Sequence, residues 1–132
     1  MARRTKVEQS SQELVAGPRA AREARVFVRS TLGTWGIRGG QVGDILLAVS
    51  ELVSNAIEHG EGRPRLHLRL EGERLEIRVR DKALRVPTPR RRDLYAERGR
   101  GLLIVGSLAD EWGHVADRTG KWVWAVFTVK GR

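Results

Sequence analysis

The stretch from Gln41 to Glu58 constrains the fold more than any other, because its apolar residues recur at helical spacing. They stand three or four positions apart and form one core-facing stripe of a helix: Val42, Ile45, Val49, Leu52 and Ala56. Glu51 and Asn55 are four apart, which places them one turn apart on a different face. A carboxylate can accept a proton, and a carboxamide oxygen is a hard ligand for Mg²⁺. The spacing fits a magnesium-dependent site, although a solvated polar stripe on an ordinary amphipathic helix is the commoner case.

A second motif, Gly99-Arg100-Gly101-Leu102, stands at the start of an apolar helical run. Glycine lets backbone N–H groups approach an anion closely, and the start of a helix adds partial positive charge. Arg100 adds a formal charge. The motif therefore predicts either an anion-binding helix start or a flexible loop that only caps the helix.

The rest of the chain alternates between helical and strand patterns. Helical spacing predicts one helix from near Pro18 to about Gly33 and another over 102–109. Alternation predicts strands over 66–70, 75–79, 112–116 and 121–129. The last of these is apolar on both faces, which is typical of a central strand covered by helices. Residues 1–12 are polar and basic without a period, so we expect a flexible tail there and one domain over 13–132.

A formal net charge of +9 is compatible with ATP, an acidic protein or nucleic acid as partner. The charge is dispersed, and we interpret the four tryptophans as core residues, so no stacking platform for single strands is predicted. Cysteine is absent, which excludes disulfides and thiolate metal sites. The three histidines lie far apart in the sequence and show no spacing typical of a metal site. No apolar run is long enough to cross a membrane and no signal peptide is evident, so we expect a cytoplasmic protein.

The motifs stand in a fixed order along the chain: Glu51 to Ala56, then Val79-Arg80-Asp81, then Gly99 to Leu102. This order resembles the N box and the two glycine boxes of the Bergerat-type ATPases, which include gyrase, heat-shock chaperones, mismatch-repair ATPases and sensor histidine kinases. The tail is similar to the small single-domain branch, the anti-sigma-factor serine kinases and their actinobacterial relatives, in Trp112-Gly113 and Gly120 to Trp124. The resemblance covers roughly residues 14 to 129.

The resemblance implies a histidine-kinase-like ATPase fold: an α/β (α+β) two-layer sandwich, with a mixed, mostly antiparallel sheet and three helices on one face. It implies ATP and Mg²⁺ as ligands. Glu51 would be the catalytic base, Asn55 would bind the metal, and Asp81 would accept a hydrogen bond from the adenine amino group. The second glycine box would bind the nucleotide through Gly99, Arg100, Gly101 and Leu102. Residues 82–98 correspond to the family's lid over ATP.

One departure from the family keeps several functions open. The first glycine box usually reads Asp-x-Gly-x-Gly, whereas here Asp81 is followed by Lys82-Ala83-Leu84-Arg85. The first hypothesis is an anti-sigma-type serine/threonine kinase that phosphorylates a small antagonist protein, sequesters a sigma factor, or does both. The second is a partner-binding module with a degenerate nucleotide site, and the missing glycines favour it. The third is a basic nucleic-acid binder. With the kinase we expect no specific nucleic acid and no membrane as partner, and a homodimer is a further option.

Overall fold

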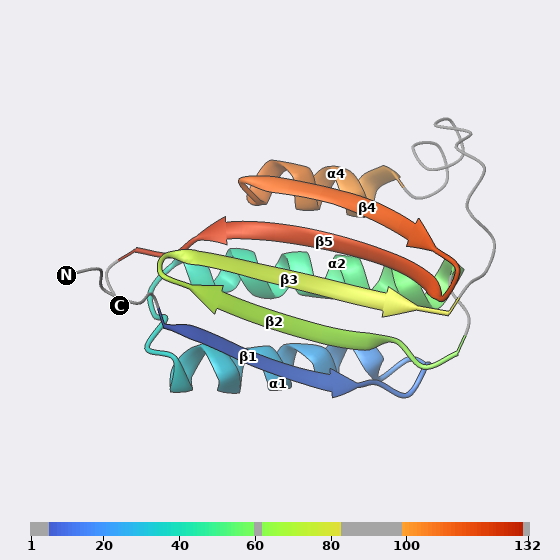
Figure 1. Cartoon of the computed structure of the whole chain (residues 1–132), viewed down its shortest axis with the longest axis horizontal. Coiled ribbons are helices and arrows are strands. Elements are labelled where there is room, and N and C mark those ends of the chain that lie inside the picture. Colours follow the sequence, from blue (N-terminus) through green and yellow to red (C-terminus); the bar gives the residue numbers. More distant parts are fainter. Residues whose placement is uncertain (1–5, 60–61, 83–98, 131–132) are drawn as a thin grey trace.

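The computed structural model describes residues 6–59, 62–82 and 99–130. Its strands and helices are, in chain order, β1 (Val7–Glu13), α1 (Ala20–Thr34), α2 (Gln41–His59), β2 (Arg65–Glu71), β3 (Arg74–Asp81), α4 (Gly99–Leu108), β4 (Glu111–Asp117) and β5 (Gly120–Thr128). The strands form one sheet in the order β1-β2-β3-β5-β4, and the helices lie together over one of its faces (Figure 1). The predicted two-layer sandwich is confirmed. Every strand pairing among the described residues is antiparallel, where a mixed sheet was expected.

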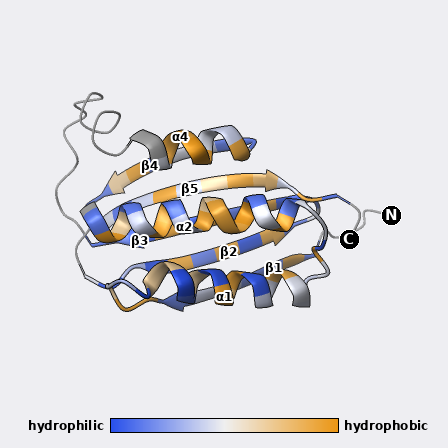
Figure 2. Cartoon of the chain, turned by 180° about the vertical axis from the view of Figure 1, so that it is seen from behind, coloured by the Kyte–Doolittle hydropathy of each residue, from blue (hydrophilic) through white to orange (hydrophobic). Residues whose placement is uncertain are grey.

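Helix α2 lies at the centre of the helical layer. It contacts α1 on one side, α4 on the other, and β3 and β5 beneath (Figure 2). Its predicted stripe is buried: Ile45, Val49 and Leu52 are fully enclosed, Ala56 nearly so, and Val42 partly. Burying one such aliphatic side chain stabilises a fold by about 1.5–3 kcal/mol. The stripe therefore joins both layers into one core.

The strand register continues this core across the sheet. Leu66, Leu68 and Leu70 of β2 stand opposite Val79, Ile77 and Leu75 of β3, and all six are buried. In β5, the buried core continues through Val123, Ala125 and Phe127. β5 lies between β3 and β4, so the predicted central position of this strand is confirmed. No helix in the described part of the chain is long and apolar enough to cross a membrane.

The prediction of a flexible tail over residues 1–12 is wrong for residues 7–12. They belong to β1, which pairs antiparallel with β2 from Val7 opposite Glu71 to Glu13 opposite Arg65. The strand reads Val-Glu-Gln-Ser-Ser-Gln-Glu, so its side chains carry no apolar alternation to reveal it. Backbone pairing at the sheet edge and the fully buried Leu14 that follows hold it in place.

The other face of the sheet carries polar and aromatic side chains, and no described helix covers it (Figure 1). Trp122 and Trp124 point to this side from β5, because they alternate with buried Val123. The guanidinium groups of Arg78 and Arg80 lie 5.8 and 5.2 Å from the centroid of the Trp122 ring. The interpretation of all four tryptophans as core residues is therefore wrong for these two, whereas Trp35 and Trp112 pack against the core.

His67 lies on the same face, half-buried, with Nε2 3.1 Å from Oε1 of Gln9. Burial, and then the positive charge of Arg78, lower the pKa of His67 below its ordinary value of 6.5. The shift favours the uncharged ring, on a surface that already holds several arginines.

Gly120 offers a test of how closely β3 and β5 approach at the end of the sheet. Its φ is +151°, and a Cβ added there would lie 2.2 Å from the carbonyl oxygen of Asp81. We expect Gly120→Ala to destabilise the fold by about 2–4 kcal/mol, because two backbone segments would have to separate. Gly43→Ala is the control, since a Cβ there meets nothing within 4 Å, and alanine in a helix should add about 0.5–1 kcal/mol. Urea unfolding measures both, and similar effects of the two changes would contradict the close approach.

Candidate functional site

The three sequence motifs meet at one end of the molecule. Figure 1 shows the C-terminal end of α2, the first turn of α4, the end of β3 and the start of β5 at this end. The contacts of α2 with α4, β3 and β5 confirm that these elements are neighbours rather than merely overlapping in the view. Side chains from four elements can therefore border a common site.

Glu51 and Gly101 are in close proximity, although they are far apart in the sequence. A Cβ placed on Gly101 would lie only 2.7 Å from Oε2 of Glu51. The carboxylate thus occupies space that any side chain at position 101 would take. Leu52 and Leu102, the next residues along each helix, are both buried in the core and hold the two helices in this position. Glu51 of α2 and Gly101 of α4 therefore lie side by side.

Asn55 stands one helical turn after Glu51 and is partly exposed. Leu52 and Ala56, which are buried, fix this part of α2 against the rest of the core. A carboxylate and a carboxamide are thus presented from a rigid element, which positions functional groups more accurately than a loop does. On the α1 side of the same helix, Arg25 Nη1 donates a hydrogen bond to Ser50 Oγ at 3.0 Å.

Asp81 lies at the end of β3 and is only 1% exposed. Its cross-strand partner is Lys121, itself 7% exposed, and Lys121 Nζ lies 3.5 Å from Asp81 Oδ2. Both side chains point toward the helices, because they continue the alternation of buried Val79 and Val123. Charged groups are rarely buried unless they are paired, and these two form such a pair.

For the remaining predicted site residues, the structure gives the helix or the burial but no contact with the other site residues. Gly99 and Arg100 belong to the first turn of α4. Leu102 is a core residue, 6% exposed, so only its backbone could serve a ligand. The predicted lid over 82–98 lies outside the described residues except for Lys82, which is exposed.

Lys121 is the residue that sequence reasoning missed. The interpretation of 121–129 as a buried strand was correct, and its alternation places position 121 on the same face as Val123, Ala125 and Phe127. A lysine on the core-facing side of a central strand requires an acidic partner. The sequence therefore indicates that Lys121 needs an acidic partner. It does not indicate which acid, because that depends on the pairing of β3 with β5.

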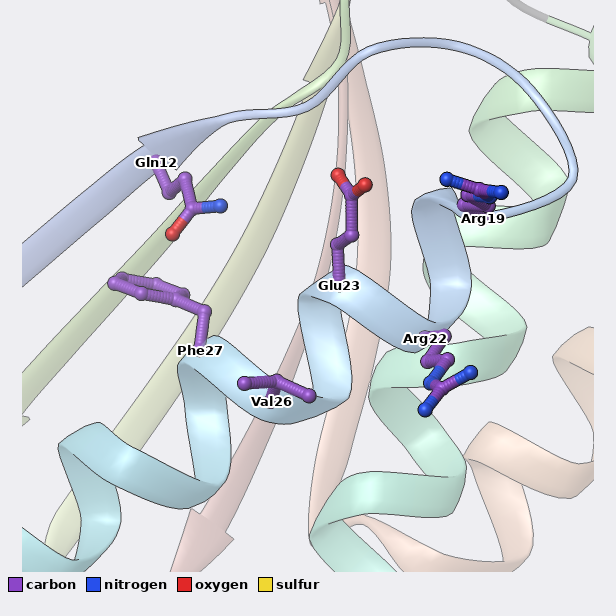
Figure 3. A pocket seen from close by; sticks show the side chains of 6 residues that line it. All are labelled: Gln12, Arg19, Arg22, Glu23, Val26 and Phe27. Carbon is purple, nitrogen blue, oxygen red and sulfur yellow. The ribbon is translucent and has the colours of Figure 1, made fainter.

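A groove of about 590 Å³ lies away from this site, between β1 and α1 (Figure 3). Figure 3 shows Phe27 of α1 pointing toward Gln12 of β1 across it. Its lining consists of Gln12, Arg19, Arg22, Glu23, Val26 and Phe27. None of the predicted site residues lines this groove, so its volume does not make it the candidate site.

The contact between Glu51 and Gly101 can be tested with a double-mutant cycle. Alanine in place of a helical glycine ordinarily stabilises by about 0.5–1 kcal/mol. In Gly101→Ala we expect this gain to be lost, because the new Cβ displaces the Glu51 carboxylate. In the Glu51→Ala background the gain should reappear, which gives a coupling free energy of at least about 0.5 kcal/mol. Urea unfolding of the four proteins measures it, and strictly additive effects would show that the two residues do not touch.

Residues 14–127 match the family described as the histidine kinase-like ATPase domain. The fold is similar to the crystal structure of the RsbU and RsbW domains of Rv1364c from Mycobacterium tuberculosis, with a TM-score of 0.72 and 23% sequence identity. That similarity covers 92% of this chain and 32% of the other, so this chain spans about a third of its relative. No curated protein sequence matches the chain. The match over residues 14–127 shows that the chain belongs to the histidine kinase-like ATPase domain family.

Proposed function

We propose that the chain binds ATP with Mg²⁺ at the site bordered by Glu51, Gly101 and Asp81, and transfers the γ-phosphoryl group to a serine or threonine of a small partner protein. The observation that carries the proposal is the contact between Glu51 and Gly101 at the start of α4. It places a potential base against a glycine helix start, where backbone N–H groups favour phosphate. The family supports nucleotide binding as the use of this site.

The residues present fit the nucleotide at two separate points. The lack of a Cβ at Gly101 lets the Glu51 carboxylate lie against the start of α4. The buried carboxylate of Asp81 is a hydrogen-bond acceptor of the kind that the adenine amino group requires. The described residues hold no cluster of three or more His, Cys, Asp or Glu side chains for a metal. Mg²⁺ usually binds through one or two protein oxygens and the phosphates of its nucleotide, so Asn55 would supply the oxygen from the protein.

In the proposed reaction the hydroxyl oxygen of the substrate forms a bond to the γ-phosphorus. The bond from that phosphorus to the β,γ-bridging oxygen breaks, and ADP leaves. Glu51 would take the hydroxyl proton. Phosphoryl transfer depends mostly on positioning and charge neutralisation, so a few well-placed side chains are sufficient. Mg²⁺ would supply the charge neutralisation at the phosphates.

The substrate would be a small antagonist protein, and a sigma factor would be a second partner held by the same domain. The sequence motifs support this branch of the family, and the likeness to a structure that contains an RsbW domain is consistent with it. A homodimer would be compatible with either partner. The net charge of +9 would favour partners with acidic surfaces.

A second candidate function is a partner-binding module with a weak nucleotide site. The chain has no glycine in the four residues after Asp81, and Lys121 occupies one side of that carboxylate. Both features distinguish the site from an ordinary adenine pocket of the family. Measured ATP turnover with candidate substrates separates this function from the kinase.

For ATP binding, we expect removal of Asp81 to abolish affinity and Asn55→Ala to weaken it chiefly when Mg²⁺ is present. Since Asp81→Ala alone would leave Lys121 buried without its acid, the variant Asp81→Ala/Lys121→Met removes both charges. Isothermal titration calorimetry with ATP, with and without Mg²⁺, measures the effects. Asp44→Asn, an exposed change at the start of α2, is the control. Absence of binding by the wild type at millimolar ATP would leave the partner-binding module as the function.

For catalysis, we expect Glu51→Gln to keep ATP affinity and to lose turnover by about 10²–10⁴-fold, the usual contribution of a general base. Glutamine preserves the size of the side chain beside Gly101, so a change in shape is not the cause. ADP production in the presence and absence of the partner protein measures the loss. Unchanged turnover would exclude Glu51 as the base.

A further inference from the structure

The face of the sheet that the described helices leave uncovered carries a row of side chains in register across neighbouring strands. Arg65 of β2 stands opposite Arg80 of β3, and Arg80 stands opposite Trp122 of β5. Val115 of β4 continues the row beyond Trp122. The row crosses the sheet where β3 ends and β5 begins, toward the right of Figure 1. We call these side chains the arginine–tryptophan row.

The arginines of this row have no acidic partner within the described part of the chain. Arg80 donates a hydrogen bond to Oγ1 of Thr119, and neither Arg65 nor Arg80 belongs to an ion pair of the described residues. Glu13 stands opposite Arg65 on the edge strand β1, but the two do not pair. The arginines at the other end of the same face are neutralised by acids, in the pairs of Arg69 with Glu71 and of Arg74 with Glu111. Positive charge without a paired acid is therefore concentrated in the row.

The other half of the row is apolar and accessible. Val115 is 55% exposed, and Trp122 and the neighbouring Trp124 are half-buried. Trp124 lies directly on the backbone of β4, since a Cβ on Gly113 would be 2.7 Å from its ring. The edge of the sheet thus presents an aromatic and aliphatic surface beside the unpaired arginines. Tryptophan and arginine are the residue types that most often dominate the binding energy of protein interfaces.

We propose that the row binds an extended acidic segment of a partner protein, with carboxylates over Arg65 and Arg80 and an apolar side chain over Val115. A guanidinium group can hold a carboxylate through two parallel hydrogen bonds. The row spans three strand spacings of about 4.8 Å, or about 14 Å, which an extended chain covers in four to five residues. Alternate side chains of such a chain face the same way, so acids at its first and third positions and an apolar residue at its fifth would meet the row in order.

Two observations favour a protein segment over a nucleic acid. The exposed Val115 needs an apolar group to cover it, and a phosphodiester chain offers none there. The Trp122 ring already has the guanidinium groups of Arg78 and Arg80 at 5.8 and 5.2 Å, so it is not a free platform for stacking a base. The inference concerns the partner and not the nucleotide, because the row and Asp81 lie on opposite faces of the sheet. It holds whether or not the chain transfers phosphate.

The test uses a peptide with blocked ends, Glu-Thr-Glu-Thr-Leu, and a control peptide with glutamine in place of both glutamates. Each is titrated into ¹⁵N-labelled protein and followed by NMR. We expect the acidic peptide to bind with a Kd below about 1 mM. It should shift the indole N–H signals of Trp122 and Trp124, whereas those of Trp35 and Trp112, which pack against the core, should stay in place. The control peptide should bind much more weakly.

Matched double variants show whether the position of the charges matters. Arg65→Gln/Arg80→Gln should weaken binding of the acidic peptide by about three- to tenfold, the loss of two exposed ion pairs. Arg69→Gln/Arg74→Gln removes the same charge from the same two strands and the same face, and it should keep the wild-type affinity. Thermal unfolding checks that both variants fold. If the first does not, Arg65→Gln replaces it, because Arg65 makes no side-chain hydrogen bond or ion pair with the described residues.

Each remaining outcome would overturn the inference. It fails if the acidic peptide causes no shifts at millimolar concentration, if the control peptide binds equally well, or if both double variants lose affinity alike. If sedimentation shows a dimer that only Arg65→Gln/Arg80→Gln dissociates, the row joins two copies of the chain instead. If single-stranded oligothymidylate binds more tightly than the peptide at about 150 mM salt and needs the same arginines, the row is a nucleic-acid site. Titration of ATP into the same variants measures the proposed function separately, and its result leaves this inference unchanged.

Discussion

The structure depends above all on the burial of one side of α2. This helix contacts both other helices and, in the sheet beneath it, β3 and β5. Its apolar stripe excludes water between the layers, and the hydrophobic effect there is the main source of stability. The polar residues Glu51 and Asn55 belong to the same rigid helix, so the force that forms the core also sets the position of the candidate site.

Many charged side chains lie on the face of the sheet that the helices leave uncovered. The helical layer covers one face of the sheet, and the other face must be compatible with water. There, arginines lie over the Trp122 ring, and ion pairs join Arg69 to Glu71 and Arg74 to Glu111. Exposed pairs of this kind contribute little stability, typically 0–1 kcal/mol. Their effect is to distribute the positive charge over a surface that also carries acids.

The buried pair of Asp81 and Lys121 differs in kind from these surface pairs. A buried ion pair adds little net stability to the fold, because the cost of removing both charges from water offsets much of their attraction. The register of β3 with β5 places this pair at the same end of the sheet as the first turn of α4 (Figure 1). No glycine stands among the four residues after Asp81, and Lys121 provides a second charged group beside the carboxylate.

The sequence by itself determined the elements whose side chains alternate between water and core. Helix α2, the hairpin of β2 and β3, and the central strand β5 could be predicted because hydrophobic periodicity is a local property. Strand β1 could not, since its polar side chains carry no period and only its pairing with β2 makes it a strand. The roles of Glu51, Asn55 and Asp81 came from a resemblance in motif order, and they stay predictions. Only the tertiary structure decided that Glu51 touches Gly101 and that Lys121 faces Asp81, because such contacts depend on how helices and strands far apart in the sequence pack against one another.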